Sequence, residues 1–381
     1  MHGTIESTLD VEWRPLAGLA SIASDWRGLA ARALEPNVFY EPAFALAAQP
    51  VFGRDVGATL IWSRGATKRL LGLFPVRTER HRYGLPWPIV VGWTNSYAPL
   101  GGPLVDREAA ELALGAWLEH IASHRRRPLL LPMFLQAGEL ANAFDAALAR
   151  CGGASVAFAM HERALLAPAG GRADYIERAL PRKKLKELGR QLRRLGDDGA
   201  VAWDTARDPA AISAALTDFL ALEEAGWKGR AGTAAARSPV LRAFLETSVS
   251  ALASEGKAEI IRLMFAERAI AALVVLRSGD TAWCWKIAYD EQHARASPGV
   301  QLMLEATKAL LAAPGLARSD SCAAPDHAMI DHIWRERLPL ADCLVRPGPH
   351  GQTAFALTRA LEAARTGAIA AAKHARDLLR R

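Results

Sequence analysis

The sequence has few cysteines, and they lie far apart. The four are Cys151, Cys284, Cys322 and Cys343 in a chain of 381 residues, and no two form a C-x-x-C pair. This spacing argues against a zinc cluster and against a disulfide framework. We therefore expect no metal ion and a reducing compartment.

Long apolar runs are also missing. No stretch reaches the ~18–20 continuous apolar residues that a membrane-spanning helix needs. The first residues, MHGTIESTLDVEW, lack the basic segment and apolar core of a secretory signal. We expect a cytoplasmic protein, with contact at the inner face of the membrane left open.

The composition is not extreme in any direction. A hydrophobic fraction of 51% and a charged fraction of 23% are typical of a folded protein. The length suits two domains. The net charge of +7 would suit a CoA-like cofactor, a nucleotide-sugar, an anionic membrane or RNA, and it selects none of these.

Strand and helix periodicities alternate along both halves, which predicts a mixed α/β (α+β) fold. The first half has a strand near 9–13, a probable hairpin at 55–63 and 69–77, and later strands and helices up to 159. The segment APAGGR at 167–172 reads as a linker. We predict a first lobe over 1–166, a second over 167–352, and a basic, Ala-rich helix over 353–381.

The second half begins with a basic helix at 181–195. Leu185, Leu188, Leu192 and Leu195 fall on one face, and the other faces carry Arg and Lys. Such a helix could contact RNA or acidic lipid, but it is more often a solvated face. Further helices are predicted at 210–224, 238–255, 300–313 and 329–337. Strands are predicted at 259–265, 269–276, 281–289, 318–322 and 342–345.

The strand 281–289, TAWCWKIAY, is unusual for its lysine. Strict alternation places Trp283, Trp285, Ile287 and Tyr289 on one face and Lys286 on the other, with Cys284 and Ala288. A buried ammonium needs a partner, and Asp290, Glu223 and Glu224 are candidates. The alternative is that Lys286 lies on a solvated face.

Two loops have residues suited to anions. Arg295-Ala-Ser-Pro-Gly-Val300 joins that strand to a helix, so helix-terminal N–H groups could bind a phosphate; it could also be a simple capping turn. The loop 222–233, LEEAGWKGRAGT, combines three glycines with Trp227, Lys228 and Arg230. Glycines permit close backbone approach, and Lys and Arg can hold an anion.

The order EEAGWKGRAGT, then a hairpin, then WKIAYDEQHARASPG, then PDHAMIDHIW at 325–334 resembles the GNAT-type acyltransferases of the CelD-type family. That family is associated with cellulose and exopolysaccharide biosynthesis and is similar to the Fem-type transferases. The resemblance covers the second half well and the first half only in element order. It implies two GNAT-like lobes, each a mixed, mostly antiparallel sheet flanked by helices.

The resemblance also implies site residues. The donor's phosphates would lie on Arg295, Ser297, Gly299 and Val300. Pro298 and Val300 stand where the family pattern has small residues, which weakens the case for acetyl-CoA as donor. Catalysis would involve Lys286, Asp290, Glu223 and His327. The substrate would contact Trp227, Lys228, Tyr289 and Trp334.

The predicted function is therefore an acyltransferase. It would move an acyl group from acyl-CoA (acetyl or longer) or an acyl carrier protein to an amine or hydroxyl of a polysaccharide precursor or glycolipid. Three alternatives stay open: N-acylation of a long-chain amine to a ceramide-like lipid, a Fem-like transferase using aminoacyl-tRNA, and a non-catalytic GNAT-like binding protein. Nucleic acid is expected as a partner only in the tRNA alternative.

Overall fold

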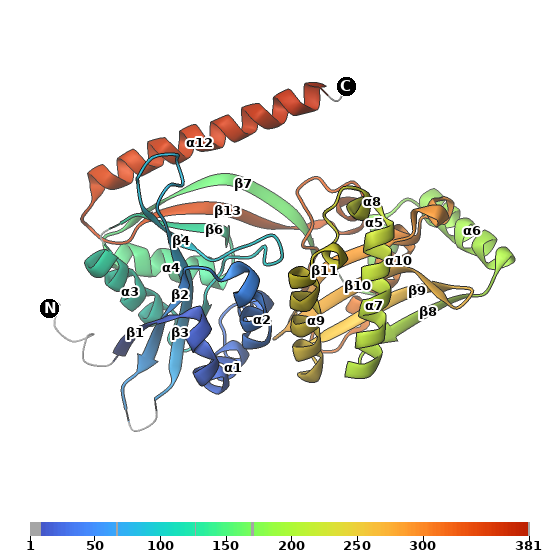
Figure 1. Ribbon diagram of the computed structural model, residues 1–381, viewed down its shortest axis with the longest axis horizontal. Helices are drawn as coiled ribbons and strands as arrows, with labels where there is room; N and C mark the ends of the chain where they lie inside the picture. Colours follow the sequence, from blue (N-terminus) through green and yellow to red (C-terminus); the bar gives the residue numbers. More distant parts are fainter. Residues whose placement is uncertain (1–8, 66–67, 126, 169–170, 380–381) are drawn as a thin grey trace. The chain divides into compact units, whose positions relative to one another are not determined.

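The structure is a computed structural model that describes residues 9–65, 68–125, 127–168 and 171–379. The chain folds into two compact units (Figure 1). Unit 1 comprises the described residues up to Pro42, Phe52–His161 and the described residues from Pro339 on. Unit 2 comprises Ala43–Val51 and Glu162–Leu338. The predicted lobe boundaries after residues 166 and 352 stay predictions.

Unit 1 is built on a mostly antiparallel sheet. Its strands lie in the order β1-β2-β3-β4-β6-β13, with β5 on β3, and β4 and β6 form its parallel pair. The strands are β1 (Leu9–Pro15), β2 (Val56–Ser63), β3 (Leu70–Glu79), β4 (Ile89–Gly92), β5 (Leu104–Val105), β6 (Leu129–Leu135) and β13 (Glu336–Arg346). The predicted hairpin at 55–63 and 69–77 is confirmed by the β2–β3 pairing.

Helices flank this sheet. They are α1 (Ala23–Ala31), α3 (Ala110–His120), α4 (Glu139–Arg150) and α12 (Gln352–Leu379), with short turns η1 (Leu16–Ile22), η2 (Val38–Tyr40) and η3 (Ile121–Arg125). The helix α2 (Pro42–Phe52) belongs almost entirely to unit 2. The helix α12 confirms the predicted carboxyl-terminal helix. Its buried Glu362 accepts two bonds from Arg82, of 3.0 and 3.1 Å, which hold α12 against the β3–β4 loop.

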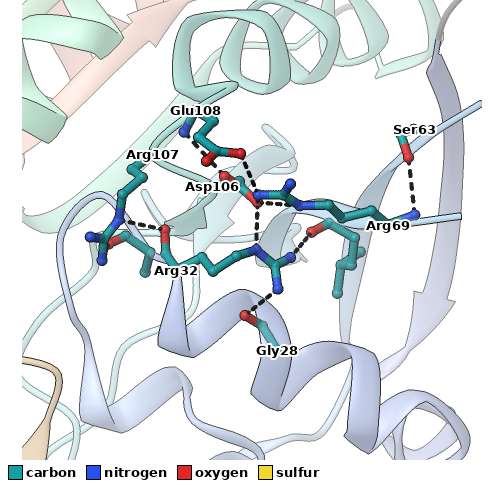
Figure 2. Close-up of polar contacts among 9 residues, drawn as sticks. Gly28, Arg32, Ser63, Arg69, Asp106, Arg107 and Glu108 are labelled. Carbon is teal, nitrogen blue, oxygen red and sulfur yellow. Dashed lines mark hydrogen bonds and ion pairs between the residues drawn. The ribbon is translucent and has the colours of Figure 1, made fainter. Parts of the chain in front are cut away.

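A cluster of ion pairs in unit 1 centres on Asp106, whose side chain is fully buried (Figure 2). The carboxylate accepts bonds from Arg32 Nε at 2.9 Å and from Arg69 Nη2 at 2.7 Å. Its other oxygen accepts the Glu108 N–H at 3.1 Å. Arg32 also donates to the Gly28 and Leu70 carbonyl oxygens, so the cluster ties α1 to β3.

Unit 2 holds a mostly antiparallel part of the sheet, in the order β7-β12-β11-β10-β9-β8, and the residues of β7 up to His161 belong to unit 1. Its strands are β7 (Ala154–Leu166), β8 (Val201–Ala206), β9 (Ala258–Phe265), β10 (Arg268–Ser278), β11 (Thr281–Tyr289) and β12 (Arg318–Asp320). The parallel pair here is β11–β12. The predicted hairpin and the strand 281–289 are confirmed as β9, β10 and β11.

Helices cover both faces of this sheet. They are α5 (Tyr175–Ala179), α6 (Arg182–Asp198), α7 (Pro209–Ala225), α8 (Trp227–Arg230), α9 (Pro239–Ser254), α10 (Pro298–Ala312) and α11 (Ile330–Ile333), with turns η4 (Ala235–Arg237) and η5 (Glu291–Ala296). The four predicted leucines of α6 pack with α10 and Cys284 in one core. On the other face, Phe244 of α9 and Phe44 of α2 make edge contacts with Trp285.

Two predicted elements are corrected, and one strand was missed. The helix expected at 329–337 is a single turn at Ile330–Ile333, and the strand expected at 342–345 begins at Glu336 instead. The strand β8 was not predicted, because its sequence VAWDTA is short and mostly half-buried at the edge of the sheet. No helix in the described part of the chain is long and apolar enough to cross a membrane.

Candidate active site in unit 2

The strands β11 and β12 part near the middle of the unit 2 sheet. Their parallel pairing covers Thr281–Trp283 against Arg318–Asp320. Beyond Trp283, β11 continues to Tyr289 while β12 has ended. Cys322 then takes a left-handed conformation with a φ of 52°, and its N–H donates to Asp320 Oδ1 at 2.9 Å. In the described residues β12 therefore pairs with only the first part of β11, and we call the edge of β11 beyond Trp283 on this side the gap.

A β-bulge in β11 decides which residues face this site. Lys286 pairs with Val274 and Cys284 with Val275, so Trp285 is the extra residue. Cys284 and Ile287 pack on the α10 side, whereas Trp285 contacts Phe244 of α9. The predicted strict alternation, which placed Ile287 with Trp285, is therefore wrong. The bulge changes the direction in which the side chains after Trp285 point. Lys286 Nζ lies 5.9 Å from the centre of the Trp285 ring.

The bulge brings Lys286 near two charged residues, Glu223 of α7 and Lys228 of α8. Glu223 is buried, and its Oε1 accepts a bond of 2.7 Å from Lys228 Nζ. Its Oε2 accepts the Ala235 N–H at 2.9 Å. Three of the predicted site residues thus form one cluster: Lys286 from β11, Glu223 from α7 and Lys228 from α8.

This environment changes the titration of Lys286. Burial, first, and the nearby Lys228 charge lower the pKa of Lys286 from 10.5 to about 8. The Glu223 carboxylate and Cys322 act in the opposite direction. A lysine with such a pKa can bind and release a proton near neutral pH, which an ordinary lysine cannot do.

The predicted loop 222–233 folds back tightly on α7. A Cβ on Gly229 would lie 1.7 Å from the Glu224 carbonyl oxygen, so glycine is required for this approach. Glu291, just after β11, accepts the Trp227 N–H at 3.0 Å and an Arg230 bond at 2.6 Å. These contacts hold the single turn α8 over the end of β11.

Two aromatic side chains lie exposed around this cluster. Trp227 and Tyr289 keep 57% and 38% of their surfaces accessible, which suits contact with a substrate. Both line a small pocket with Glu223, Lys228 and Glu291. Its volume of about 30 Å³ holds roughly one water molecule. A thioester would therefore need α8 to shift outward.

The predicted phosphate turn, residues 295–300, lies between β11 and the body of α10. Ser297 is left-handed with a φ of 51° and its side chain does not cap α10. Pro298 has no N–H, and Gly299 is buried with the Tyr289 ring 3.0 Å from where a Cβ would lie. Arg295 is exposed and Val300 is half-buried. The turn thus presents the Gly299 and Val300 N–H groups of the first helical turn.

The remaining predicted residues have other contacts. Asp290 caps η5 through the Gln292 N–H at 2.8 Å and approaches His293 Nδ1 at 3.2 Å. His327 Nδ1 accepts the Met329 N–H at 3.4 Å. Trp334 is fully buried and donates to Thr307 at 2.9 Å, so a substrate cannot reach its ring in this structure. These contacts of Asp290, His327 and Trp334 go to residues other than Lys286.

Sequence reasoning missed a buried ion pair below the gap. Arg163 on β7 pairs with Asp320 on β12, and both are almost fully buried. Asp320 also accepts the Cys322 N–H, so the pair supports the turn that separates β12 from β11. A lone Arg in a strand and a lone Asp in another give no sequence signal that they meet.

Unit 1 holds a cavity of about 580 Å³. Arg346, Pro349, His350 and Phe355 help to line it, and none of the predicted site residues does. No group of three or more His, Cys, Asp or Glu side chains in the described parts of the chain could hold a metal ion. The cluster of titratable groups around Lys286 therefore makes unit 2 the candidate location of the active site.

Comparison with known proteins agrees with this placement. Residues 182–327 match the family model described as an acetyltransferase (GNAT) domain. This segment contains β11, the gap and the Lys286 cluster, so the match to an acetyltransferase (GNAT) domain falls on the candidate site. No curated protein matches the sequence.

Solved structures with a similar fold cover most of the chain. The carboxyl-terminal domain of a proposed lysylphosphatidylglycerol synthetase from Agrobacterium fabrum is 11% identical, with a TM-score of 0.53, 90% of this chain and 95% of that chain covered. FemX is 9% identical, with a TM-score of 0.53 and 85% and 95% covered. A Bacteroides thetaiotaomicron protein of unknown function is 10% identical, with a TM-score of 0.51 and 88% and 100% covered. These similarities concern the fold alone.

Proposed function

We propose that unit 2 transfers an acyl group from a thioester to an amine or hydroxyl by direct attack. The observation that carries this proposal is the bulge at Trp285, which places Lys286 beside Glu223 and Lys228 where β12 has left β11. A gap between strands offers backbone N–H groups to a thioester. The lysine beside it offers a proton acceptor.

Lys286 would act on the acceptor. In its neutral form it takes the proton from the attacking amine or hydroxyl as the new bond to the carbonyl carbon forms. With a pKa of about 8, roughly one lysine in ten is neutral at pH 7. At the ordinary value of 10.5 the fraction would be about one in three thousand. The lowered pKa therefore increases the reactive fraction about 300-fold.

The rest of the step needs little from the protein. The carbonyl oxygen becomes negative in the tetrahedral intermediate and is stabilised by N–H groups of β11 near the bulge. The C–S bond then breaks, and the thiolate takes the proton that Lys286 received. Glu223 does not take part in bond making; it orients Lys228 and moderates the charge that two neighbouring lysines create. No acyl-enzyme is required, and burial raises the pKa of the Cys284 thiol, which makes it a poor nucleophile.

The donor is a thioester of CoA or of an acyl carrier protein. The resemblance to the CelD-type family suggests a polysaccharide precursor or glycolipid as acceptor. A long-chain amine, which would give a ceramide-like product, has the same reacting group. The exposed rings of Trp227 and Tyr289 would contact the acceptor's apolar or sugar surface in either case.

Hydrogen exchange tests the location without knowledge of the acceptor. We expect a bound thioester donor to slow amide exchange over β11, η5 and the start of α10, residues 284–300. Exchange over α8 should change as well, because α8 must move. Protection that falls only in unit 1 would contradict the proposal. The same donors should raise the melting temperature at concentrations well above their Kd.

A further inference from the structure

The outer face of α6 has an unusual charge distribution. The following residues share one side of the helix and are called the basic stripe: Arg182, Lys183, Lys186, Arg190, Arg193 and Arg194. At 100° per residue they span an arc of about 120°, opposite the buried leucines. All six are exposed, and the stripe is roughly 18 Å long.

This distribution does not stabilise the helix. Cations in the first turn oppose the helix dipole, and the first turn of α6 has no acidic residue. Pairs such as Lys186 with Arg190 and Arg190 with Arg194 stand four residues apart and repel each other. Glu187 offsets part of this by pairing with Arg190 at 2.6 Å. A stripe that costs stability by itself points to an anionic partner.

The helix that carries the stripe lies beside the turn that precedes α10. Gln301 of α10 is buried, and its Nε2 donates to the Leu188 carbonyl oxygen of α6 at 2.7 Å. The helix α6 also packs against η5. Figure 1 shows α6 alongside α10 in unit 2. The anionic partner would therefore sit next to the place where the donor's phosphate is expected.

The turn itself suits a single phosphate better than a pyrophosphate. The Ser297 N–H is bonded to the Ala294 carbonyl oxygen, and the Gln301 N–H to that of Ser297. Pro298 has none, so Gly299 and Val300 supply the N–H groups of this turn. CoA has a pyrophosphate and a 3′-phosphate on one nucleotide. A phosphopantetheine arm on a protein has one phosphodiester, and the rest of its negative charge lies on the protein.

We propose that the acyl donor is a thioester on the phosphopantetheine arm of an acidic carrier protein, and that the basic stripe binds the acidic surface of that protein. This inference rests on the proposed function of unit 2. On transfer, the carbonyl carbon bonds to the acceptor nitrogen or oxygen, the C–S bond breaks, and the carrier leaves with a free pantetheine thiol.

Other anionic partners fit the stripe less well. One CoA nucleotide is shorter than a stripe of about 18 Å. The leucines of α6 point into the core, so the stripe has no apolar side chain to insert into a membrane. The sequence of α6 contains no aromatic residue on which an RNA base could stack.

Charge reversal of the stripe tests this partner. The variant Arg182→Glu/Lys186→Glu/Arg193→Glu changes exposed positions and leaves the Glu187–Arg190 pair intact. We expect kcat/KM with palmitoyl-loaded acyl carrier protein to fall at least 10-fold, and kcat/KM with palmitoyl-pantetheine to stay within 2-fold. Added salt should lower the kcat/KM of the wild type with the loaded carrier much more than it lowers the kcat/KM of the variant with the same donor.

A matched control reverses the same amount of charge elsewhere in unit 2. Arg242→Glu/Arg268→Glu/Lys308→Glu should leave both donors unaffected. Equal losses with both donors in the stripe variant would overturn the inference, as would an unchanged rate with the carrier. So would a stripe variant that loses binding to RNA or to phosphatidylglycerol vesicles but keeps its rate with the carrier.

A binding measurement separates this inference from the proposed function. Fluorescence anisotropy of labelled holo carrier protein should show binding to the wild type and at least 10-fold weaker binding to the stripe variant. If the wild type binds the carrier but transfers no acyl group from any thioester, the proposed function fails and the docking surface stands. If it transfers from palmitoyl-pantetheine but does not bind the carrier, the docking surface fails alone.

Discussion

Replacing Asp106 with Asn should destabilise unit 1 by a predictable amount. The substitution keeps the shape of the side chain and an oxygen for the Glu108 N–H, and it removes the negative charge. Arg32 and Arg69 would lose the carboxylate that accepts their bonds of 2.9 and 2.7 Å (Figure 2). Because Asp106 is fully buried, water cannot replace that carboxylate at the centre of the cluster.

The size of this loss of stability depends on how exposed the two arginines are. Removing one partner of a fully buried ion pair costs about 3–5 kcal/mol. Arg32 and Arg69 keep 35% and 38% of their side chains exposed and can regain water. We therefore expect a cost of about 2–3 kcal/mol, below the fully buried range. The slowest-exchanging amides of β2 and β3 should then exchange about 30- to 150-fold faster.

Native-state hydrogen exchange read by mass spectrometry measures this cost within unit 1, without assuming that both units unfold together. Glu108→Gln is the matched control, since Glu108 binds the same Arg69 at 2.8 Å but is 71% exposed. It should accelerate exchange less than about fivefold. An Asp106→Asn effect as small as that of the control would refute the reasoning.

The pH dependence gives an independent check on Asp106. Burial alone would raise its pKa, but bonds from Arg32, the Glu108 N–H and Arg69 outweigh it, so the folded-state pKa lies below 3.8. A group with a depressed pKa contributes stability in full above its unfolded value, and this is lost as pH falls through the folded value. The difference between wild type and Asp106→Asn should stay constant from pH 7 to about 5 and shrink below about 4.

Three further predictions concern the site. The kcat/KM of transfer should rise with pH through an apparent pKa of about 8. The variant Lys228→Met should move this pKa upward, because a neighbouring positive charge is lost. If kcat/KM does not change with pH in the wild type or in Lys228→Met, Lys286 does not take part in the proton transfer. Gly229→Ala should reduce transfer at least 100-fold, since its methyl group would collide with the Glu224 carbonyl, whereas Gly196→Ala, with open space around it, should have no effect on the rate. Glu291→Gln should weaken the bond from Arg230 of α8 to residue 291, loosen α8 over the end of β11 and raise KM more than it lowers kcat, as steady-state kinetics would show.

Much of unit 2 could be predicted from the sequence, because its elements have clear periodic patterns and end signals. The leucines of α6 mark its buried face, and Ser238 with Pro239 marks the start of α9, where Ser238 accepts the Leu241 N–H. Lys286 stood out as a lysine within an apolar strand. These are local signals: α6 and α9 lie where their patterns indicated, and Lys286 lies in the predicted strand.

The remaining features of the candidate site depend on contacts between residues that are distant in the sequence. The bulge at Trp285 moves Lys286 to the other face, and no local pattern shows it, since a bulge is defined by the pairing with β10. The pairing of Arg163 with Asp320 joins two strands far apart in the chain. The resemblance implied that Trp334 contacts the substrate, but its ring fills the core. Sequence order gives no information about which of these meet.

One assay tests the central claim most directly: acceptor-dependent release of free thiol from a thioester donor, compared among wild type, Lys286→Met and Cys284→Ser. We predict that the wild type releases thiol and forms the acylated product in equal amounts. Cys284→Ser should keep that activity, because no acyl-enzyme forms, and Lys286→Met should lose at least 100-fold while its circular dichroism spectrum is unchanged. A wild-type rate in Lys286→Met, or loss in Cys284→Ser with a trapped acyl-enzyme in the wild type, would contradict the account.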